Sequence, residues 1–215
     1  MKSILLIGAG LFGKHVAMNL QRLKDQVMVI DKDEQSINEL LPYVTDAKIG
    51  DATNEEFLKL LDIPSFDVCI VAIGDSFENS LQITSLLKEL GGKIVVSRAS
   101  SDVHEKFLLR NGADRVVFPE KQLAKWTAIC YDSEAVFDYI ELDEEHFIYE
   151  IAVPKMWADK TIKELDVRNK YGINILAVKS RGRLNDMAGP DTRLHDRDTM
   201  YILGSLKAIH KTFKL

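Results

Sequence analysis

The first 31 residues carry the pattern of a strand, a helix and a second strand, and this pattern constrains the fold more than any other feature of the chain. An apolar run, Ile4–Ile7, leads directly into the loop Gly8–Gly13, which has glycine at its first, third and last positions. A helical pattern follows, and a second apolar run, Val27–Ile30, ends on Asp31. Such a unit is typical of proteins that hold a nucleotide at the edge of a parallel sheet.

Each glycine of this loop has its own structural role. Gly8 permits the tight turn out of the strand, Gly10 lets the backbone approach a phosphate, and Gly13 lets the helix pack closely on the sheet. The new helix directs free N–H groups at phosphate oxygens. Asp31 lies roughly 20 residues further on, where an acid accepts hydrogen bonds from ribose hydroxyls. The alternative is a tight turn that binds nothing.

Strand and helix patterns alternate up to Pro119. The predicted strands are Ile4–Ile7, Val27–Ile30, Ala47–Ile49, Val68–Ile73, Lys93–Val96 and Val116–Phe118. Continuous apolar runs are expected of parallel strands that are buried on both faces. The pattern therefore predicts an α/β fold with a Rossmann-type, doubly wound parallel sheet.

The pattern changes after Pro119. Residues Lys121–Tyr139 read as one long amphipathic helix, and a β-rich segment with runs such as Phe147–Val153 and Ile173–Lys179 follows. We therefore expect a nucleotide-binding domain over residues 1–119, a crossover or linker helix over 120–140, and a small C-terminal α+β domain over 141–215.

The composition narrows the classes of function. Lys and Arg number 28 against 33 Asp and Glu, so the net charge is −5 and no basic surplus is available for a nucleic acid. No apolar stretch approaches the roughly 20 residues of a membrane-spanning helix. No His, Cys or Ser grouping has the spacing of a metal centre or a nucleophilic triad. We expect a non-enzymatic protein with no nucleic-acid partner.

Polar and small residues follow the ends of the later strands, where the ligand of a parallel sheet lies. Asp51 could accept from an adenine amino group, or it could cap the helix that begins near Glu55. Gly74 could admit a base or ribose, or simply complete a turn. Arg98 could reach a phosphate, or remain a solvated surface residue. Glu120 could bind a divalent cation, or complement the dipole of the helix after Pro119.

Several segments together resemble the regulator of potassium conductance (RCK) family, which includes the cytosolic Trk/Ktr-type subunits of bacterial potassium uptake systems. The segments are Gly8-x-Gly10-x-x-Gly13 with Asp31, Gly50-Asp51-Ala52-Thr53, Val71-Ala72-Ile73-Gly74, Gly112-Ala113-Asp114-x-Val116-x-x-Pro119-Glu120-Lys121, Leu165-Asp166-Val167-Arg168-x-Lys170-Tyr171-Gly172-x-Asn174-Ile175-Leu176-Ala177-Val178 and Asp196-x-Asp198 followed by Gly204. The resemblance covers essentially the whole chain.

The resemblance implies roles for individual positions. The phosphates would lie on Gly8, Gly10 and Gly13 with Arg98 near them, the ribose on Asp31, and the adenine on Asp51, Ala52 and Thr53. The other expected nucleotide-binding positions are Ala9, Leu11, Phe12, Lys32, Ala72, Ile73 and Gly74. Glu120 matches an acid that is linked to divalent-cation activation in some members. In other members the C-terminal domain binds cyclic di-AMP, and the matching positions are Ile162, Arg168, Asn174, Ile175 and Pro190.

One position departs from the family. Members that are switched by ATP and ADP often carry Arg after the second glycine, where this chain has Leu11. ATP or ADP remains the expected ligand, with NAD(H) or AMP as alternatives. Asp31 disfavours NADP, because its carboxylate would face the 2′-phosphate.

The resemblance implies a gating subunit of a potassium uptake channel or transporter. Such a subunit forms a homodimer, and octameric rings of these dimers lie at the cytoplasmic, inner face of the plasma membrane against a separate potassium-transporting protein. The alternatives are an NAD-dependent oxidoreductase, or a nucleotide sensor that docks on another cation transporter.

Overall fold

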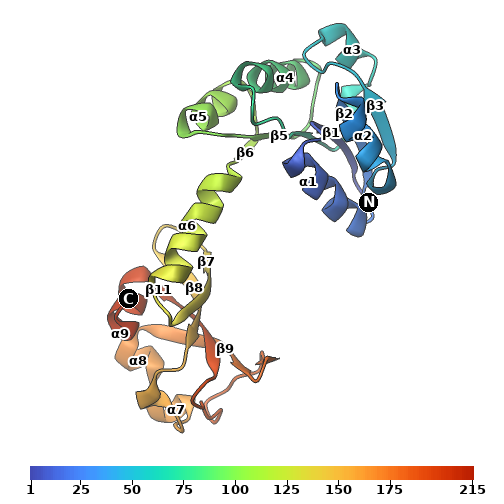
Figure 1. The fold of residues 1–215 in the computed structure, drawn as a ribbon. Coiled ribbons are helices and arrows are strands. Elements are labelled where there is room, and N and C mark those ends of the chain that lie inside the picture. Colours follow the sequence, from blue (N-terminus) through green and yellow to red (C-terminus); the bar gives the residue numbers. More distant parts are fainter. The chain divides into compact units, whose positions relative to one another are not determined.

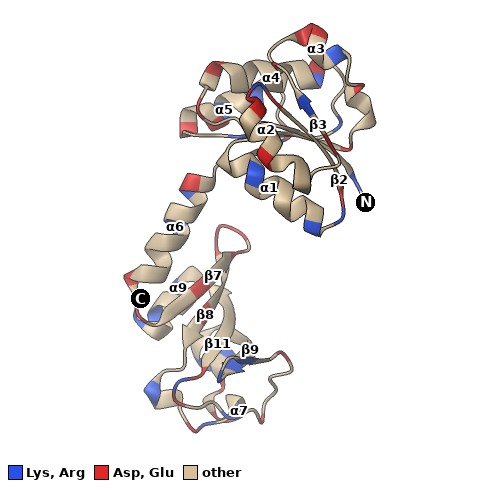
Figure 2. Ribbon diagram, turned by 45° about the vertical axis from the view of Figure 1, so that its right-hand side comes forward, with Lys and Arg blue, Asp and Glu red and all other residues tan.

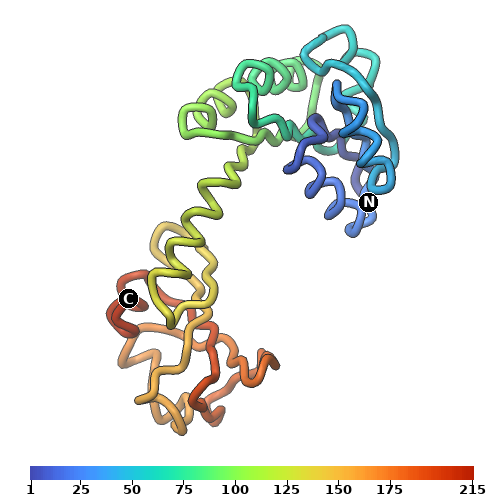
Figure 3. Tube along the Cα trace, viewed as in Figure 1, coloured from blue at the N-terminus to red at the C-terminus, as the bar shows by residue number.

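The chain folds into two compact units, Met1–Lys121 and Gln122–Leu215, in a computed structural model that describes residues 1–215. Figure 3 follows the first unit from blue into green and the second from yellow-green into red.

The first unit is built on a six-stranded parallel sheet with the order β3-β2-β1-β4-β5-β6 (Figure 1). The strands are β1 (Ser3–Ile7), β2 (Gln26–Asp31), β3 (Asp46–Ile49), β4 (Val68–Val71), β5 (Val95–Arg98) and β6 (Arg115–Val117). The chain therefore starts in the middle of the sheet, builds outward to one edge, returns to β4 beside β1 and builds to the other edge. This is the strand order of a doubly wound nucleotide-binding fold, as the sequence predicts.

Helices cover both faces of this sheet. They are α1 (Leu11–Arg22), α2 (Glu34–Leu40), α3 (Glu55–Lys59), α4 (Phe77–Glu89) and α5 (Asp102–Arg110), with short 3-10 turns at Leu41–Tyr43 and Ile63–Ser65. One core joins Leu6 and Val29 to residues of α1 and α2. A second core joins Leu5 and Ile7 to residues of α3 and α4. Adjacent residues of β1 thus point into different cores, which explains its unbroken apolar run.

The second unit contains a five-stranded antiparallel sheet with the order β10-β9-β11-β8-β7. Its strands are β7 (Val136–Glu141), β8 (His146–Ala152), β9 (Ile173–Ser180), β10 (Arg183–Asn185) and β11 (Thr199–Ser205). The helices are α7 (Ile162–Leu165), α8 (Val167–Tyr171) and α9 (Leu206–Phe213), with a 3-10 turn at Lys155–Trp157. Alternate residues such as Phe147, Tyr149 and Ile151 face one core. This is the small α+β domain that the sequence predicts.

The predicted helix over Lys121–Tyr139 is wrong beyond Asp132. Helix α6 covers Pro119–Asp132, and the chain then forms β7, which pairs with β8. Val136 and Tyr139 are spaced three apart and both reach the core, which imitates a helical pattern. A register irregularity between Val136 and Asp138 produces the same spacing in a strand.

None of the helices combines the length and the apolar content that a bilayer-spanning segment needs. Figure 2 marks the Lys and Arg positions in blue and the Asp and Glu positions in red along the ribbon. Helix α1 carries Lys14 and Arg22 and no acid, whereas α2 carries Glu34 and Glu39 and no Lys or Arg.

Candidate functional site

The glycine loop after β1 is held in a conformation that its glycines make possible. Gly8 has φ +106°, a region that side chains rarely adopt, and its N–H donates to the Ile30 carbonyl at 2.9 Å. A Cβ added at Gly13 would lie 1.9 Å from the carbonyl oxygen of Gly8. At Gly10 an added Cβ would meet nothing within 4 Å, so this side of the loop is open. The loop thus has two tightly packed glycines around one accessible position.

Helix α1 begins at this loop without a side-chain cap. Gly10 is its N-cap residue, and its first turn holds no acidic residue. Leu11 is 77% exposed, whereas Phe12 packs against the core below. The uncapped N–H groups at the start of α1 therefore remain available to an anion.

Asp31 ties the end of β2 to the glycine loop. Its Oδ2 accepts from the Ala9 N–H at 2.7 Å, and its Oδ1 accepts from the Asp33 N–H at 2.9 Å. A carboxylate oxygen has two lone-pair sites, so each oxygen can accept one bond more. The geometry leaves the carboxylate able to accept from two neighbouring hydroxyl groups.

The loop after β3 is ordered by its own side chains. Oδ1 of Asp51 accepts from both the N–H and the hydroxyl of Thr53, at 2.9 and 2.7 Å. The Thr53 hydroxyl, followed by its N–H, lowers the pKa of Asp51, and the nearby charge of Lys32 adds to this. Asp51 is not the N-cap of the next helix, which was one of its two predicted roles. Asn54 takes that place.

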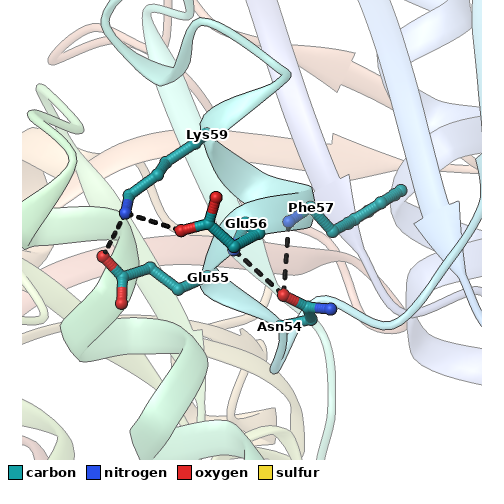
Figure 4. A network of polar contacts seen from close by, with 5 residues as sticks. All are labelled: Asn54, Glu55, Glu56, Phe57 and Lys59. Carbon is teal, nitrogen blue, oxygen red and sulfur yellow. Dashed lines mark hydrogen bonds and ion pairs between the residues drawn. The ribbon is translucent and has the colours of Figure 1, made fainter.

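Figure 4 shows how Asn54 starts α3. Its Oδ1 accepts from the N–H groups of Glu56 and Phe57, at 2.9 and 3.4 Å. Lys59 then pairs with Glu55 and Glu56, each at 2.9 Å, and these bonds raise the pKa of Lys59 to about 12. The Phe57 ring lies so close to Gly50 that an added Cβ there would be 2.3 Å from it. This packing fixes the loop between β3 and α3.

These loops enclose one pocket at the carboxyl edge of the sheet. It is lined by Gly8, Asp31, Lys32, Asp51, Ala52, Thr53 and Ile73 from the predicted set, and by Ile7, Ile30, Gly50, Asp75, Ser76, Asn79 and Ile83. Ile7, Ile30 and Gly50 adjoin predicted positions. Asp75, Ser76, Asn79 and Ile83 were not assigned, because their place depends on where β4 ends, at Val71, and on where α4 begins, after its N-cap Ser76. A Ser directly before an apolar helical pattern was a usable start signal, since Ser76 caps α4 by accepting from the Asn79 N–H. The other predicted positions, Ala9, Gly10, Leu11, Phe12, Gly13, Ala72, Gly74 and Arg98, lie outside this lining.

Arg98 and Glu120 form an ion pair outside the lining of this pocket. Nη2 of Arg98 donates to Oε1 of Glu120, and the guanidinium carbon lies 5.4 Å from the centre of the Phe12 ring. A Cβ added at Gly74 would be 2.9 Å from that carbon. The pKa of Glu120 is lowered by its own backbone N–H and then by Arg98. Glu120 also lies in the first turn of α6, so both of its interactions compensate its charge.

The chain alone does not assemble a metal site at Glu120. No three His, Cys, Asp or Glu side chains come together in the structure, and Glu120 supplies a single carboxylate that Arg98 already contacts. A divalent cation there would need oxygen ligands from elsewhere.

The second unit has a cavity of its own, with a volume of about 320 Å³. Its lining includes all five positions predicted for a second ligand, Ile162, Arg168, Asn174, Ile175 and Pro190. Nε of Arg168 donates to Oδ1 of Asn174 at 2.9 Å, which holds the guanidinium beside the cavity.

Comparison with known proteins gives two family matches. The model of the TrkA-N domain matches residues 4–119, and that of the TrkA-C domain matches residues 147–215. The Ktr system potassium uptake protein C of Bacillus subtilis (strain 168) is 40% identical over 211 residues, covering 98% of this chain and 95% of that protein. The Ktr system potassium uptake protein A of the same organism is 35% identical over 210 residues, with the same coverage.

Solved structures agree on the fold. The crystal structure of the GsuK RCK domain superposes with a TM-score of 0.70 at 19% identity, covering 100% of this chain and 47% of that one. The GsuK channel bound to NAD gives a TM-score of 0.69 at 20% identity, covering 96% and 38%. The chain thus spans less than half the length of these two solved chains.

These matches confirm the resemblance that the sequence motifs carry. The protein belongs to the RCK family of TrkA-N and TrkA-C domain proteins, among the Trk/Ktr-type subunits of potassium uptake systems.

Proposed function

We propose that this protein is a nucleotide-binding regulatory subunit that gates a potassium uptake channel or transporter. The observation that carries the proposal is the pocket at the carboxyl edge of the first sheet, where Asp31 and Asp51 present ordered carboxylates beside the glycine loop. The two Ktr potassium uptake proteins, which match nearly the whole chain, support the potassium system as the process it serves.

An adenine nucleotide is the ligand that this arrangement fits best. The ribose hydroxyls would donate to Asp31, and the base would lie in the pocket against Asp51, Ala52 and Thr53. The phosphates would meet the loop from Gly8 to Gly13 and the uncapped start of α1. ATP and ADP are the expected pair. NAD(H) and AMP are the alternatives, because exposed Leu11 offers no charge to a terminal phosphate.

The cavity of the second unit is the proposed site for cyclic di-AMP. The Arg168 guanidinium could pair with a phosphate group, and apolar Ile162, Ile175 and Pro190 could contact the bases. For this function we propose a nucleotide-binding domain over residues 1–119 and a C-terminal domain over residues 141–215, with a linker helix between them that ends at Asp132.

Regulation requires that the bound nucleotide distinguish two arrangements of the assembly. A ligand shifts such an equilibrium only by the difference between its affinities for the two states. We propose a homodimer, assembled into an octameric ring, on the cytoplasmic side of a separate potassium-transporting membrane protein. A change in the ring on nucleotide exchange would open or close that protein.

Potassium flux tests this function. A Ktr-type membrane subunit is reconstituted in vesicles, and flux is measured with and without this protein, in the presence of ATP, ADP, AMP or NAD. We expect flux that depends on both the protein and the nucleotide. Flux that does not change with any nucleotide would refute the gating role. Turnover of NAD with a panel of alcohols and hydroxy acids would indicate an oxidoreductase instead.

A further inference from the structure

The guanidinium of Arg98 lies at a crossing point of three elements. Arg98 is the last residue of β5, Phe12 belongs to the first turn of α1, and Glu120 belongs to the first turn of α6. The guanidinium carbon is 5.4 Å from the Phe12 ring centre, and it fills the space that a side chain at Gly74 would need. Arg98 therefore lies beside the helix start where phosphate is expected.

The positive charge of Arg98 is compensated by one carboxylate only. Arg98 makes a single side-chain hydrogen bond, from Nη2 to Glu120, although a guanidinium has five N–H donors. Its Nε is buried and has no partner, and 23% of its side chain is exposed. The Nε faces Gly74, whereas the other N–H groups of this partly exposed guanidinium make no hydrogen bond besides the one to Glu120, which leaves capacity for an additional acceptor.

A phosphate at the glycine loop would be a better partner than the present one. It offers several acceptor oxygens to a planar fork, whereas Glu120 accepts one bond and is 57% exposed. The phosphate and the Glu120 carboxylate then compete for the Arg98 guanidinium. Glu120 loses little when it is released, because its own backbone N–H in the first turn of α6 still stabilises its charge.

We propose that Glu120 is a brake on the nucleotide site: it holds Arg98 when no nucleotide is bound, and the phosphate chain displaces it. The inference rests on the proposed function and adds a regulatory element to it. It makes a counterintuitive prediction, that removing this acid strengthens nucleotide binding. It also couples occupancy of the glycine loop to the first turn of α6, where Glu120 lies.

Calorimetry on the full chain in metal-free buffer with EDTA tests the exchange, with ADP and adenosine as the two probes. Glu120→Gln should bind ADP about two to five times more tightly than the wild type, the scale of a lost exposed ion pair. Adenosine, which has no phosphate, should bind both forms equally. Arg98→Gln should bind ADP about ten times more weakly, and Glu120→Gln added to it should have no further effect.

Asp102→Asn is the matched control. Asp102 is an exposed acid that pairs with Lys121 at 2.6 Å, so its loss changes the net charge equally without touching Arg98. ADP binding that is unchanged or weaker in Glu120→Gln would overturn the brake, as would an equal gain in Asp102→Asn. If the wild type binds neither ADP nor adenosine, the proposed function fails as well. If it binds ADP but Glu120→Gln does not bind more tightly, only the role of Glu120 fails.

Discussion

The backbone N–H of Ala9 donates to Oδ2 of Asp31 at 2.7 Å, which joins the glycine loop to the end of the second strand. The residue expected to bind the ribose is therefore also a support of the loop expected to bind the phosphates. Two parts of one ligand would be positioned by a single carboxylate, so changes at Asp31 should affect both.

Asp31→Ala should weaken adenine-nucleotide binding by about tenfold or more, because hydrogen bonds to a charged group contribute roughly 1.5–3 kcal/mol each. Calorimetry measures the dissociation constant for ADP. Asp33→Ala is the control, since Asp33 caps α2 through the Ser36 N–H at 2.9 Å and lies outside the pocket lining. An equal loss in both variants would argue that loop order alone is responsible.

Gly13→Ala and Gly10→Ala should separate folding from binding. A Cβ at Gly13 would collide with the Gly8 carbonyl at 1.9 Å, so α1 must shift, at a cost of about 1–3 kcal/mol. At Gly10 the methyl group has open space, so stability should change by no more than about 1 kcal/mol while it obstructs the phosphate. Hydrogen exchange of α1 and ADP calorimetry measure the two effects. Normal ADP binding by Gly10→Ala would contradict the assignment of the phosphate to this loop.

The sequence predicts the first unit well because its apolar strand runs and its glycine-rich turn indicate the same fold. Unbroken apolar runs at Ile4–Ile7 and Val27–Ile30, separated by a glycine-rich turn and one helix, admit few folds other than a parallel sheet. The end of α6 was not predictable in this way. Val136 and Tyr139 satisfy both a helical spacing and a strand with an irregular register, and only pairing with β8 decides between them.

The pairing of Arg98 with Glu120 could not be predicted from the sequence alone either. Both residues were expected at the ligand edge, but 22 positions separate them, and which acid neutralises Arg98 depends on the register of β5 against β6. The same limit applies to Asn79 and Ile83, whose place in the pocket follows from where α4 begins.

A buried carboxylate in the second unit gives a prediction about pH. Glu150 accepts from Lys179 at 3.0 Å, Thr199 at 2.7 Å and Tyr201 at 2.6 Å. Burial alone would raise the pKa of Glu150, but these bonds outweigh it and hold the pKa below its usual value. The bond to Glu150 in turn raises the pKa of Tyr201 to about 12.

The lowered pKa of Glu150 stabilises the fold above its unfolded value, about 4.3, and this contribution disappears as the pH falls through the folded value. The raised pKa of Tyr201 stabilises the fold below about 10, and its contribution disappears as the pH rises through about 12.

Glu150→Gln should therefore destabilise the second unit by about 1–3 kcal/mol at pH 7, and by progressively less below pH 4. Both tryptophans, Trp126 and Trp157, lie in this unit, so their fluorescence in urea reports on it alone. Glu141→Gln, which breaks an exposed pair with Lys125, should cost less than about 1 kcal/mol. A difference between wild type and Glu150→Gln that is constant with pH would contradict the cluster's role.

His104 gives a matching prediction for the first unit. The ring is fully buried, its Nδ1 accepts from the Ser100 N–H at 3.3 Å, and it lies 4.8 Å from the Phe77 ring. Burial lowers the pKa of His104, so the unfolded state binds the proton first and stability falls as the pH decreases below about 6.5. Hydrogen exchange of α5 between pH 7 and pH 5 should show this decrease. His104→Gln should remove it, and exposed His15→Gln should not.

A structure of the protein with ADP tests the central claim most directly, because it shows whether the pocket holds an adenosine group and what holds the sugar. We expect the ribose hydroxyls on the Asp31 carboxylate, the base beside Asp51 and the phosphates at the start of α1. ADP bound elsewhere, or a sugar that makes no contact with Asp31, would contradict the account.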